Sequence, residues 1–158
     1  MRHLALFDCT YSIVRRCDSH YPFEAGAGED TERRQRIIAR KLHIFLVDDD
    51  SNFRKAFGTR LHDDYGATID DVNCGEDALT KPIDTYDVIF IDVVMPGMSG
   101  ITVCERLLKR ELKPLIALMS TNPDNETAAE EQKVSFYDKM DVAKLEEILL
   151  SAVGDGAA

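Results

Sequence analysis

The chain has 158 residues and a formal net charge of −10, and 44% of its residues are hydrophobic. This length and apolar content suffice for one domain of ordinary size with a real core. No stretch approaches the roughly 20 apolar residues of a membrane helix, and the N-terminus has no apolar core of signal-peptide type. We therefore expect a cytoplasmic protein without a membrane span.

The charge is unevenly distributed along the chain. Residues 1–41 carry 8 Lys or Arg and 6 Asp or Glu, a balance of +2, whereas residues 42–158 carry 11 and 23, a balance of −12. Nucleic-acid phosphates require a cationic face, so the acidic body argues against a nucleic-acid partner.

Residues 1–41 show no repeating hydrophobic period, and residues 21–30 have the Pro and Gly content of a loop. Residues 31–41 favour a short basic helix with few apolar residues to bury. We therefore predict that residues 1–41 form a mobile N-terminal extension, that residues 42–153 form one domain, and that residues 154–158 form a tail. A zinc site is not expected in the extension, because His3, Cys9, Cys17 and His20 match no common ligand spacing.

Short apolar runs alternate with helical patterns from residue 43 onward. The runs cover residues 43–47, 67–72, 87–91, 115–119 and 134–137. This alternation predicts an α/β fold with a parallel sheet and helices on both faces. The first, third and fourth runs are continuously apolar, as central strands are, whereas the other two are mixed, as edge strands are. The pattern predicts a doubly wound, five-stranded parallel sheet of order 2-1-3-4-5, the flavodoxin-like arrangement.

Two of the predicted helices should be short. Pro82 interrupts the helical pattern after the second run, and the pattern around residues 126–132 is weakly apolar. The other helices show apolar residues at helical spacing, with Ser51 and Asp141 at candidate cap positions.

Acidic residues follow two strands that should be neighbours. Asp48, Asp49 and Asp50 come directly after the first strand, and Asp92 follows the third. In the predicted order, the carboxyl ends of these strands meet at one edge of the sheet, where like charges repel unless a cation is present. Carboxylate, backbone and water oxygens are the ligands that Mg²⁺ prefers. The sequence therefore predicts an acidic Mg²⁺ site there, with Asp50 as a solvated loop residue outside it.

Two further features belong to this edge. Lys139 ends the fifth strand, which delivers its ammonium group toward the carboxylates, where it could neutralise a phosphoryl oxygen. The loop after Asp92 contains Pro96 and Gly97, which favour a tight turn before the next helix.

With these motifs in place, residues 42–153 resemble the receiver domain of bacterial two-component response regulators. The resemblance is carried by FLVDDD (residues 45–50), DVIFIDVVMPGMSG (87–100), KPLIALMS (113–120) and Lys139. It implies that Asp92 accepts a phosphoryl group from the phosphohistidine of a sensor histidine kinase or a phosphotransfer protein. No output domain is expected after the last helix, so signalling would pass through contacts with a downstream protein.

The resemblance also implies a ligand set for the metal. Asp49 and Asp92 would bind Mg²⁺ directly, together with the backbone carbonyl of Val94, and Asp48 would hold it through water. Lys139 would pair with the phosphoryl group. The domain would not be an enzyme in the ordinary sense, because its chemistry is limited to its own phosphorylation and dephosphorylation.

One position departs from the family pattern. The family has a Thr or Ser after the fourth strand that responds to the phosphoryl group. Counting without a gap from Pro114 places Met119 there, and a shift of one residue places Ser120 there. We favour Ser120, because a hydroxyl can hydrogen-bond the phosphoryl oxygen and a thioether cannot donate.

Two other functions fit parts of the pattern. A pseudo-receiver would keep the fold as an interaction module without phosphorylation, and the Met119 position motivates this alternative. A phosphatase of the haloacid dehalogenase type also uses an Asp at a strand end, but it needs a second acid two residues later. Val94 stands at that position and cannot transfer a proton.

Overall fold

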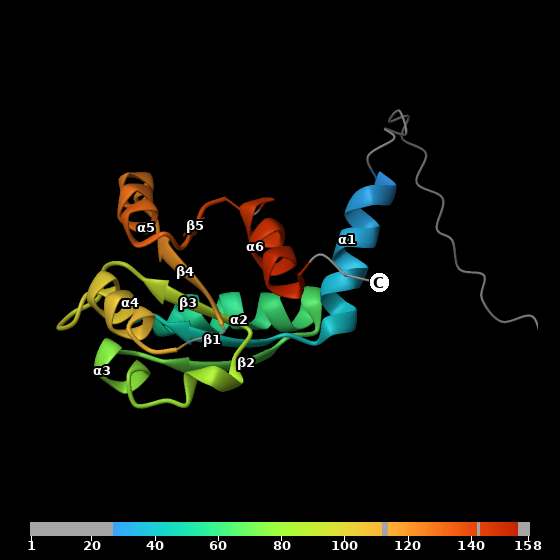
Figure 1. Cartoon of the computed structure of the whole chain (residues 1–158). Helices are drawn as coiled ribbons and strands as arrows, with labels where there is room; N and C mark the ends of the chain where they lie inside the picture. The colour runs from blue at the N-terminus through green and yellow to red at the C-terminus, as the bar shows by residue number, and fades with distance from the viewer. Residues whose placement is uncertain (1–26, 112–113, 142, 155–158) are drawn as a thin grey trace, which may run out of the picture.

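A computed structural model of the chain describes residues 27–111, 114–141 and 143–154 (Figure 1). Within these ranges, five parallel strands form one sheet of order β2-β1-β3-β4-β5, which confirms the predicted topology. The strands are β1 (His43–Val47), β2 (Thr68–Val72), β3 (Val88–Asp92), β4 (Leu115–Ser120) and β5 (Ser135–Asp138). The zinc candidates of residues 1–26 and most of the predicted tail lie outside the described residues.

Helices cover both faces of the sheet (Figure 1). On one face, α2 (Ser51–Tyr65) and α6 (Ala143–Val153) contribute to a shared apolar cluster with β1, β3 and β4. On the other face lie α3 (Gly75–Ala78), α4 (Gly100–Leu108) and α5 (Glu126–Gln132). The short helices α3 and α5 agree with the sequence prediction, and two 3-10 turns, Ile83–Thr85 and Pro123–Asn125, precede β3 and α5.

Side chains alternate along β3, and this alternation determines the face of the sheet on which its last residue, Asp92, lies. Val88 and Phe90 pack with α2 and α6, whereas Ile89 and Ile91 pack with α3 and α4. Because side chains alternate between faces with a period of two, Asp92 continues the α2 and α6 face at the carboxyl end of the strand. Among the described residues, no helix is long and apolar enough to cross a membrane.

The structure differs from the expected mobile extension over residues 27–40. These residues form a helix, α1 (Ala27–Arg40), that lies beside α6 (Figure 1). The Ile37 side chain is completely buried in the α2 and α6 cluster. Arg34 pairs with Asp64 of α2 at 3.0 Å, and Arg36 donates to the carbonyl of Gly154 at 3.1 Å. Helix α1 is therefore part of the folded domain, held by partners that are distant in sequence.

Neighbouring isoleucines of α1 provide a matched test of this docking. Ile37 is fully buried and Ile38 is 43% exposed. We expect Ile37→Ala to lower the free energy of unfolding by about 2–5 kcal/mol, because it removes buried methylenes and leaves a cavity. Ile38→Ala should change it by less than about 1 kcal/mol. Urea unfolding of the two variants measures both values, and equal small losses would contradict the docking of α1.

Candidate metal centre at the carboxyl edge of the sheet

Three carboxylates converge where β1 and β3 end side by side. Val47 of β1 pairs with Ile91 of β3, so the residues that follow emerge together. One carboxylate oxygen from each of Asp48, Asp49 and Asp92 lies within 4.8 Å of the others. Asp48 is fully buried, Asp92 is 7% exposed, and Asp49 is exposed. The structure thus brings together the three residues that the sequence predicted, with one of them open to solvent.

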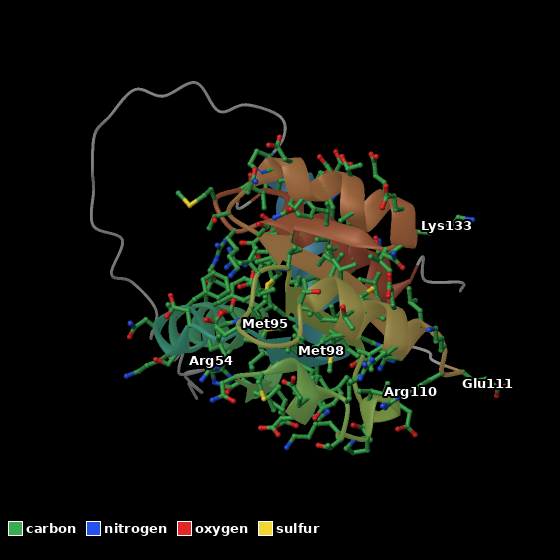
Figure 2. All side chains as sticks on the ribbon, turned by 90° about the vertical axis from the view of Figure 1, so that its left-hand side faces the viewer. Arg54, Met95, Met98, Arg110, Glu111 and Lys133 are labelled. Atoms are coloured by element: carbon green, nitrogen blue, oxygen red, sulfur yellow. The ribbon has the colours of Figure 1, made fainter. Side chains whose placement is uncertain are left out.

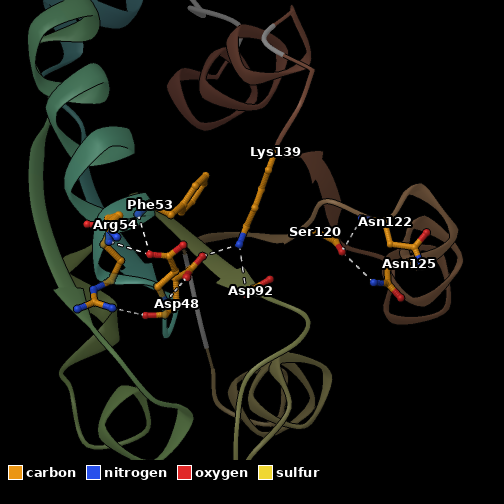
Figure 3. Close-up of polar contacts among 10 residues, drawn as sticks. Asp48, Phe53, Arg54, Asp92, Ser120, Asn122, Asn125 and Lys139 are labelled. Carbon is orange, nitrogen blue, oxygen red and sulfur yellow. Dashed lines mark hydrogen bonds and ion pairs between the residues drawn. The ribbon is translucent and has the colours of Figure 1, made fainter.

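Lys139 reaches the same place from the end of β5 (Figure 3). Its Nζ atom lies 2.6 Å from Oδ2 of Asp48 and 3.2 Å from Oδ2 of Asp92. The Lys139 side chain is only 10% exposed. A buried carboxylate is costly unless it is paired and hydrogen-bonded, so the ammonium group compensates the two least exposed acids of the cluster.

Asp48 accepts hydrogen bonds from both backbone and side-chain donors. Its Oδ1 accepts the N–H of Asp50 at 2.8 Å, and its backbone carbonyl accepts Nη1 of Arg54 at 2.6 Å. Arg54 also donates through Nε to Asp71 at 3.1 Å, which ties the end of β1 to the end of β2. These contacts fix the Asp48 carboxylate in one orientation beside Asp92.

Asp50 has a structural role that the sequence interpretation missed. Its Oδ1 accepts the N–H groups of Asn52 at 2.8 Å and Phe53 at 3.3 Å, so it is the N-cap of α2. Ser51, the predicted cap position, is instead the first residue of the helix. Asp50 lies outside the carboxylate cluster because its side chain turns toward the orphan N–H groups of the helix.

Burial raises the pKa of the Asp92 carboxyl above its ordinary value, since the charged form loses hydration. Lys139 acts in the opposite direction, the Asp48 charge raises the pKa further, and the backbone N–H of Val94 lowers it. The net upward shift means that burial, together with the Asp48 charge, outweighs the effect of the Lys139 ammonium group and the Val94 N–H. An all-oxygen donor set with excess negative charge, open on the Asp49 side, fits Mg²⁺.

The loop after Asp92 is anchored to the α3 and α4 side of the domain. Met95 is buried and Met98 is half-buried against the same apolar cluster, and Figure 2 shows the two side chains near one another. Gly97 has φ +79°, a left-handed conformation that glycine adopts without strain. Between these anchors and Asp92, Val94 remains 68% exposed at the rim of the acidic cluster.

The structure does not bring the Ser120 hydroxyl to the carboxylates. Met119, which is fully buried, pairs with Asp92 in the register of β3 and β4, and Ser120 falls on the opposite face because side chains alternate. The Ser120 Oγ accepts the N–H of Asn122 at 3.0 Å and Nδ2 of Asn125 at 2.9 Å, on the side away from Lys139 (Figure 3). The expectation that favoured Ser120 over Met119 therefore disagrees with this geometry.

Two contacts at this edge were not predicted from the sequence. The ring of Phe53 lies under the Lys139 ammonium, with Nζ 4.3 Å from the ring centroid. Gly100, the first residue of α4, approaches the backbone of Asp92 so closely that a Cβ there would lie 1.9 Å from the Asp92 carbonyl oxygen. Phe53 and Lys139 are far apart in sequence, so their contact emerges only once the sheet and its helices are assembled. The approach of Gly100 to Asp92 is local in sequence and depends on how the start of α4 packs on the end of β3.

Comparison with known proteins agrees with this arrangement of fold and acidic residues. The sequence profile of the response regulator receiver domain matches residues 44–141, more than half of the chain. The chain belongs to the response regulator receiver domain family. Receiver domains are signalling modules of two-component systems rather than classical enzymes.

Curated relatives include transcriptional regulators. The chain is 34% identical over 76 residues to the transcriptional regulatory protein ResD of Bacillus subtilis, covering 48% of this chain and 31% of ResD. It is 38% identical over 81 residues to the probable transcriptional regulator ycf27 of Cyanidium caldarium, covering 50% of this chain and 32% of that protein. The chain thus spans about a third of the length of these relatives.

Solved receiver structures have the same fold. The response regulator TrrA from Thermotoga maritima, solved in complex with Mg²⁺–BeF, has a TM-score of 0.62 and 25% identity, covering 70% of this chain and 98% of that one. A CheY-like receiver domain from Methylobacillus flagellatus has a TM-score of 0.60 and 27% identity, with the same coverage of 70% and 98%. Helix α1 lies before the residues that the family profile matches.

Adjacent acids in the β1–α2 loop provide a matched test of the metal site. We expect Asp49→Asn to weaken Mg²⁺ binding by about tenfold or more, because it removes one of the three carboxylates that could bind the ion. Asp50→Asn should leave the Mg²⁺ affinity unchanged, since Asp50 lies outside the cluster and asparagine caps a helix as well as aspartate does. Isothermal titration calorimetry measures both affinities, and an equal loss in the two variants would show that only total charge matters.

Proposed function

We propose that this domain is a phosphorylation-activated signalling receiver. Asp92 accepts a phosphoryl group from a sensor histidine kinase or a phosphotransfer protein with the help of Mg²⁺, and the signal leaves through protein–protein contacts in the cytoplasm. One observation carries the proposal: a carboxylate at the end of a central strand lies within 4.8 Å of two other carboxylates and 3.2 Å from a lysine ammonium.

Asp92 supplies the nucleophile. A carboxylate oxygen of Asp92 forms a bond to phosphorus as the bond from phosphorus to the donor histidine nitrogen breaks, and the donor imidazole keeps the electron pair of that bond. The reaction needs the anionic form of Asp92, which Lys139 and the backbone N–H of Val94 favour against the effect of burial. The buried position excludes competing water from all but the open side of the cluster.

The remaining residues hold the charge of the phosphoryl group. Asp49 and Asp92 would bind Mg²⁺ directly with the Val94 carbonyl, and Asp48 would hold it through water. The bound cation would neutralise the negative charge on the equatorial phosphoryl oxygens during in-line transfer. Lys139, which already contacts Asp92 Oδ2, is placed to pair with an oxygen of the phosphoryl group once Asp92 carries it.

The test is phosphorylation by acetyl phosphate, followed by the intact mass of the protein. We expect one phosphoryl adduct in the presence of Mg²⁺ and none after chelation with EDTA. The absence of an adduct, under conditions that modify another receiver domain, would refute the proposal. That result would favour a pseudo-receiver, an interaction module in which Met119 opposite Asp92 marks the loss of phosphorylation-dependent signalling.

Because Val94 is the exposed residue beside Asp92, we expect the phosphorylated domain to lose its phosphoryl group slowly. Valine offers no carboxylate or amide that could orient an attacking water beside Asp92. Val94→Asn should shorten the lifetime of the phosphorylated protein, whereas Met140→Asn, at another exposed apolar residue of this edge, should not. Decay of the adduct in intact mass measures the lifetime, and a wild-type half-life of seconds at neutral pH would contradict the expectation.

A further inference from the structure

Lys139 has an aromatic contact that the proposed phosphoryl transfer does not yet explain. The ammonium group touches Asp48 on one side and Asp92 on another, and the ring of Phe53 lies 4.3 Å from Nζ on a third (Figure 3). These contacts leave the Lys139 side chain 10% exposed. Lysine has a flexible four-carbon stem and a strongly hydrated head, so an ammonium group with so little contact with water must be held by its neighbours.

The position of the Phe53 ring is set by the core. Asp50 caps α2 and accepts the Phe53 N–H at 3.3 Å, which fixes the first turn of the helix. The ring then stacks on Phe57 with 5.2 Å between centroids, and Phe57 stacks on Tyr137 at 5.3 Å. Tyr137 precedes Lys139 by two residues in the chain, at the end of β5. A continuous aromatic stack therefore connects α2 to the strand that delivers the lysine.

The ring holds the ammonium group in a way that the carboxylates cannot. A cation over an aromatic face is attracted by the negative face of the ring quadrupole. Unlike Asp48 and Asp92, the ring has no affinity for a hard divalent cation. Mg²⁺ bound directly by Asp92, and through water by Asp48, would weaken the attraction of both carboxylates for Lys139, whereas the contact with Phe53 would remain.

We propose that Phe53 is a positioning residue for phosphorylation, whose ring keeps the Lys139 ammonium directed at the Asp92 oxygen where a phosphoryl group forms. The role rests on the proposed function and on the observed arrangement of Phe53, Lys139 and Asp92. Phe53 forms no bond in the reaction. It acts by placing the charge of Lys139, so its effect should depend on the electrons of the ring as well as on its shape.

The decisive experiment changes the ring electrons while keeping the ring. Successive fluorination of Phe53, with mono-, di- and trifluorophenylalanine, weakens the cation–π attraction at nearly constant shape. With acetyl phosphate and saturating Mg²⁺, we expect the phosphorylation rate to fall with each added fluorine. Phe53→Leu should lower the rate by about fivefold, which corresponds to the loss of the free energy of one cation–π contact. Phe53→Tyr should restore the rate, because its ring face is equally able to hold a cation.

A second Lys–Phe pair provides the matched control. Lys144 lies 5.8 Å from the ring centroid of Phe136, with its Nζ paired to Glu126 at 2.6 Å and away from the acidic cluster. The same fluorinated residues at position 136 should leave the phosphorylation rate unchanged. A rate that falls equally at both positions would overturn the proposal, since it would reflect general perturbation of the fold.

A spectroscopic readout tests the contact without any phosphorylation. In the metal-free protein, the ring current of Phe53 should shift the Lys139 ε-methylene protons upfield, and Phe53→Leu should abolish that shift. If wild type is phosphorylated and Phe53→Leu reacts at the same rate, the positioning role fails while the proposed function stands. If wild type takes no phosphoryl group, the proposed function fails and the positioning role with it, even where the upfield shift is observed.

Discussion

The Asp92→Asn variant is expected to take up no phosphoryl group and, without metal, to unfold at higher urea concentration than wild type. The first effect follows because an amide oxygen lacks the negative charge of the carboxylate that attacks phosphorus. The second follows from electrostatics. Burial, the largest cause, raises the pKa of Asp92, so at neutral pH the folded state holds a charge that the unfolded chain hydrates better. Removing it should therefore raise the free energy of unfolding, while Lys139 keeps its ion pair with Asp48.

The raised pKa of Asp92 also predicts how the stability of wild type should change with pH. A carboxyl whose pKa is higher in the folded state binds its proton more tightly there, which stabilises the fold at low pH. That contribution is complete below the unfolded pKa and is lost as the pH rises through the raised pKa of Asp92. Wild type should therefore lose stability relative to Asp92→Asn as the pH rises toward neutrality, when both are unfolded by urea in EDTA.

The control for the phosphorylation effect is Asp50→Asn, which removes a nearby charge and should be phosphorylated like wild type. An adduct that persists in Asp92→Asn would place the acceptor on another residue. A variant that loses phosphorylation and is also less stable than wild type would show that Asp92 supports the metal-free fold, contrary to the direction of its pKa shift.

The sequence was sufficient for the sheet and for most of the acidic cluster. Three continuously apolar runs marked the central strands, and that ranking agreed with the flavodoxin-like order, which places the ends of β1 and β3 side by side. Once those ends are neighbours, Asp48, Asp49 and Asp92 must approach one another, and a lysine after β5 must reach the same edge. These positions depend on strand order, and the hydrophobic pattern together with the flavodoxin-like arrangement was enough to predict that order.

The features that escaped prediction depend on side-chain direction or on tertiary contact. A difference of one residue separates Met119 from Ser120, and it moves the side chain to the other face of the sheet; the apolar pattern of β4 is the same in either register. Helix α1 has one fully buried isoleucine, and its arginines find their partners in α2, just before β3 and just after α6. The amino-acid composition of α1 therefore resembles that of a solvated segment, although the helix packs against the rest of the domain.

Gly100→Ala is expected to be among the most destabilising single substitutions in the domain. A Cβ at this position would lie 1.9 Å from the Asp92 carbonyl oxygen and 2.7 Å from its carbonyl carbon. The obstacle is the backbone of a central strand, which cannot move as a flexible side chain could. We expect the free energy of unfolding to fall by about 3 kcal/mol or more, a large part of the 5–15 kcal/mol of a typical domain.

Gly58→Ala is the matched control, since it adds the same methyl group inside α2. Its Cβ would lie 3.5 Å from Ile69 and 3.7 Å from Leu46, which is ordinary van der Waals contact. Alanine should therefore stabilise the helix by about 0.5–1 kcal/mol, because glycine loses more conformational freedom on folding. Urea unfolding should place the two variants on opposite sides of wild type, and a Gly100→Ala protein as stable as wild type would contradict the close approach.

The close approach of Gly100 to Asp92 also predicts weaker Mg²⁺ binding in any Gly100→Ala protein that still folds. The Gly100 N–H donates to the Val93 carbonyl at 3.1 Å, so the start of α4 is bonded to the residue that follows Asp92. Relief of the clash must move either the start of α4 or the end of β3. Because the Gly100 N–H is bonded to Val93, we expect either movement to shift the Asp92 carboxylate relative to Asp48 and Asp49. Mg²⁺ affinity should therefore fall in this variant and remain unchanged in Gly58→Ala, because only the first substitution acts on the strand that carries the acceptor.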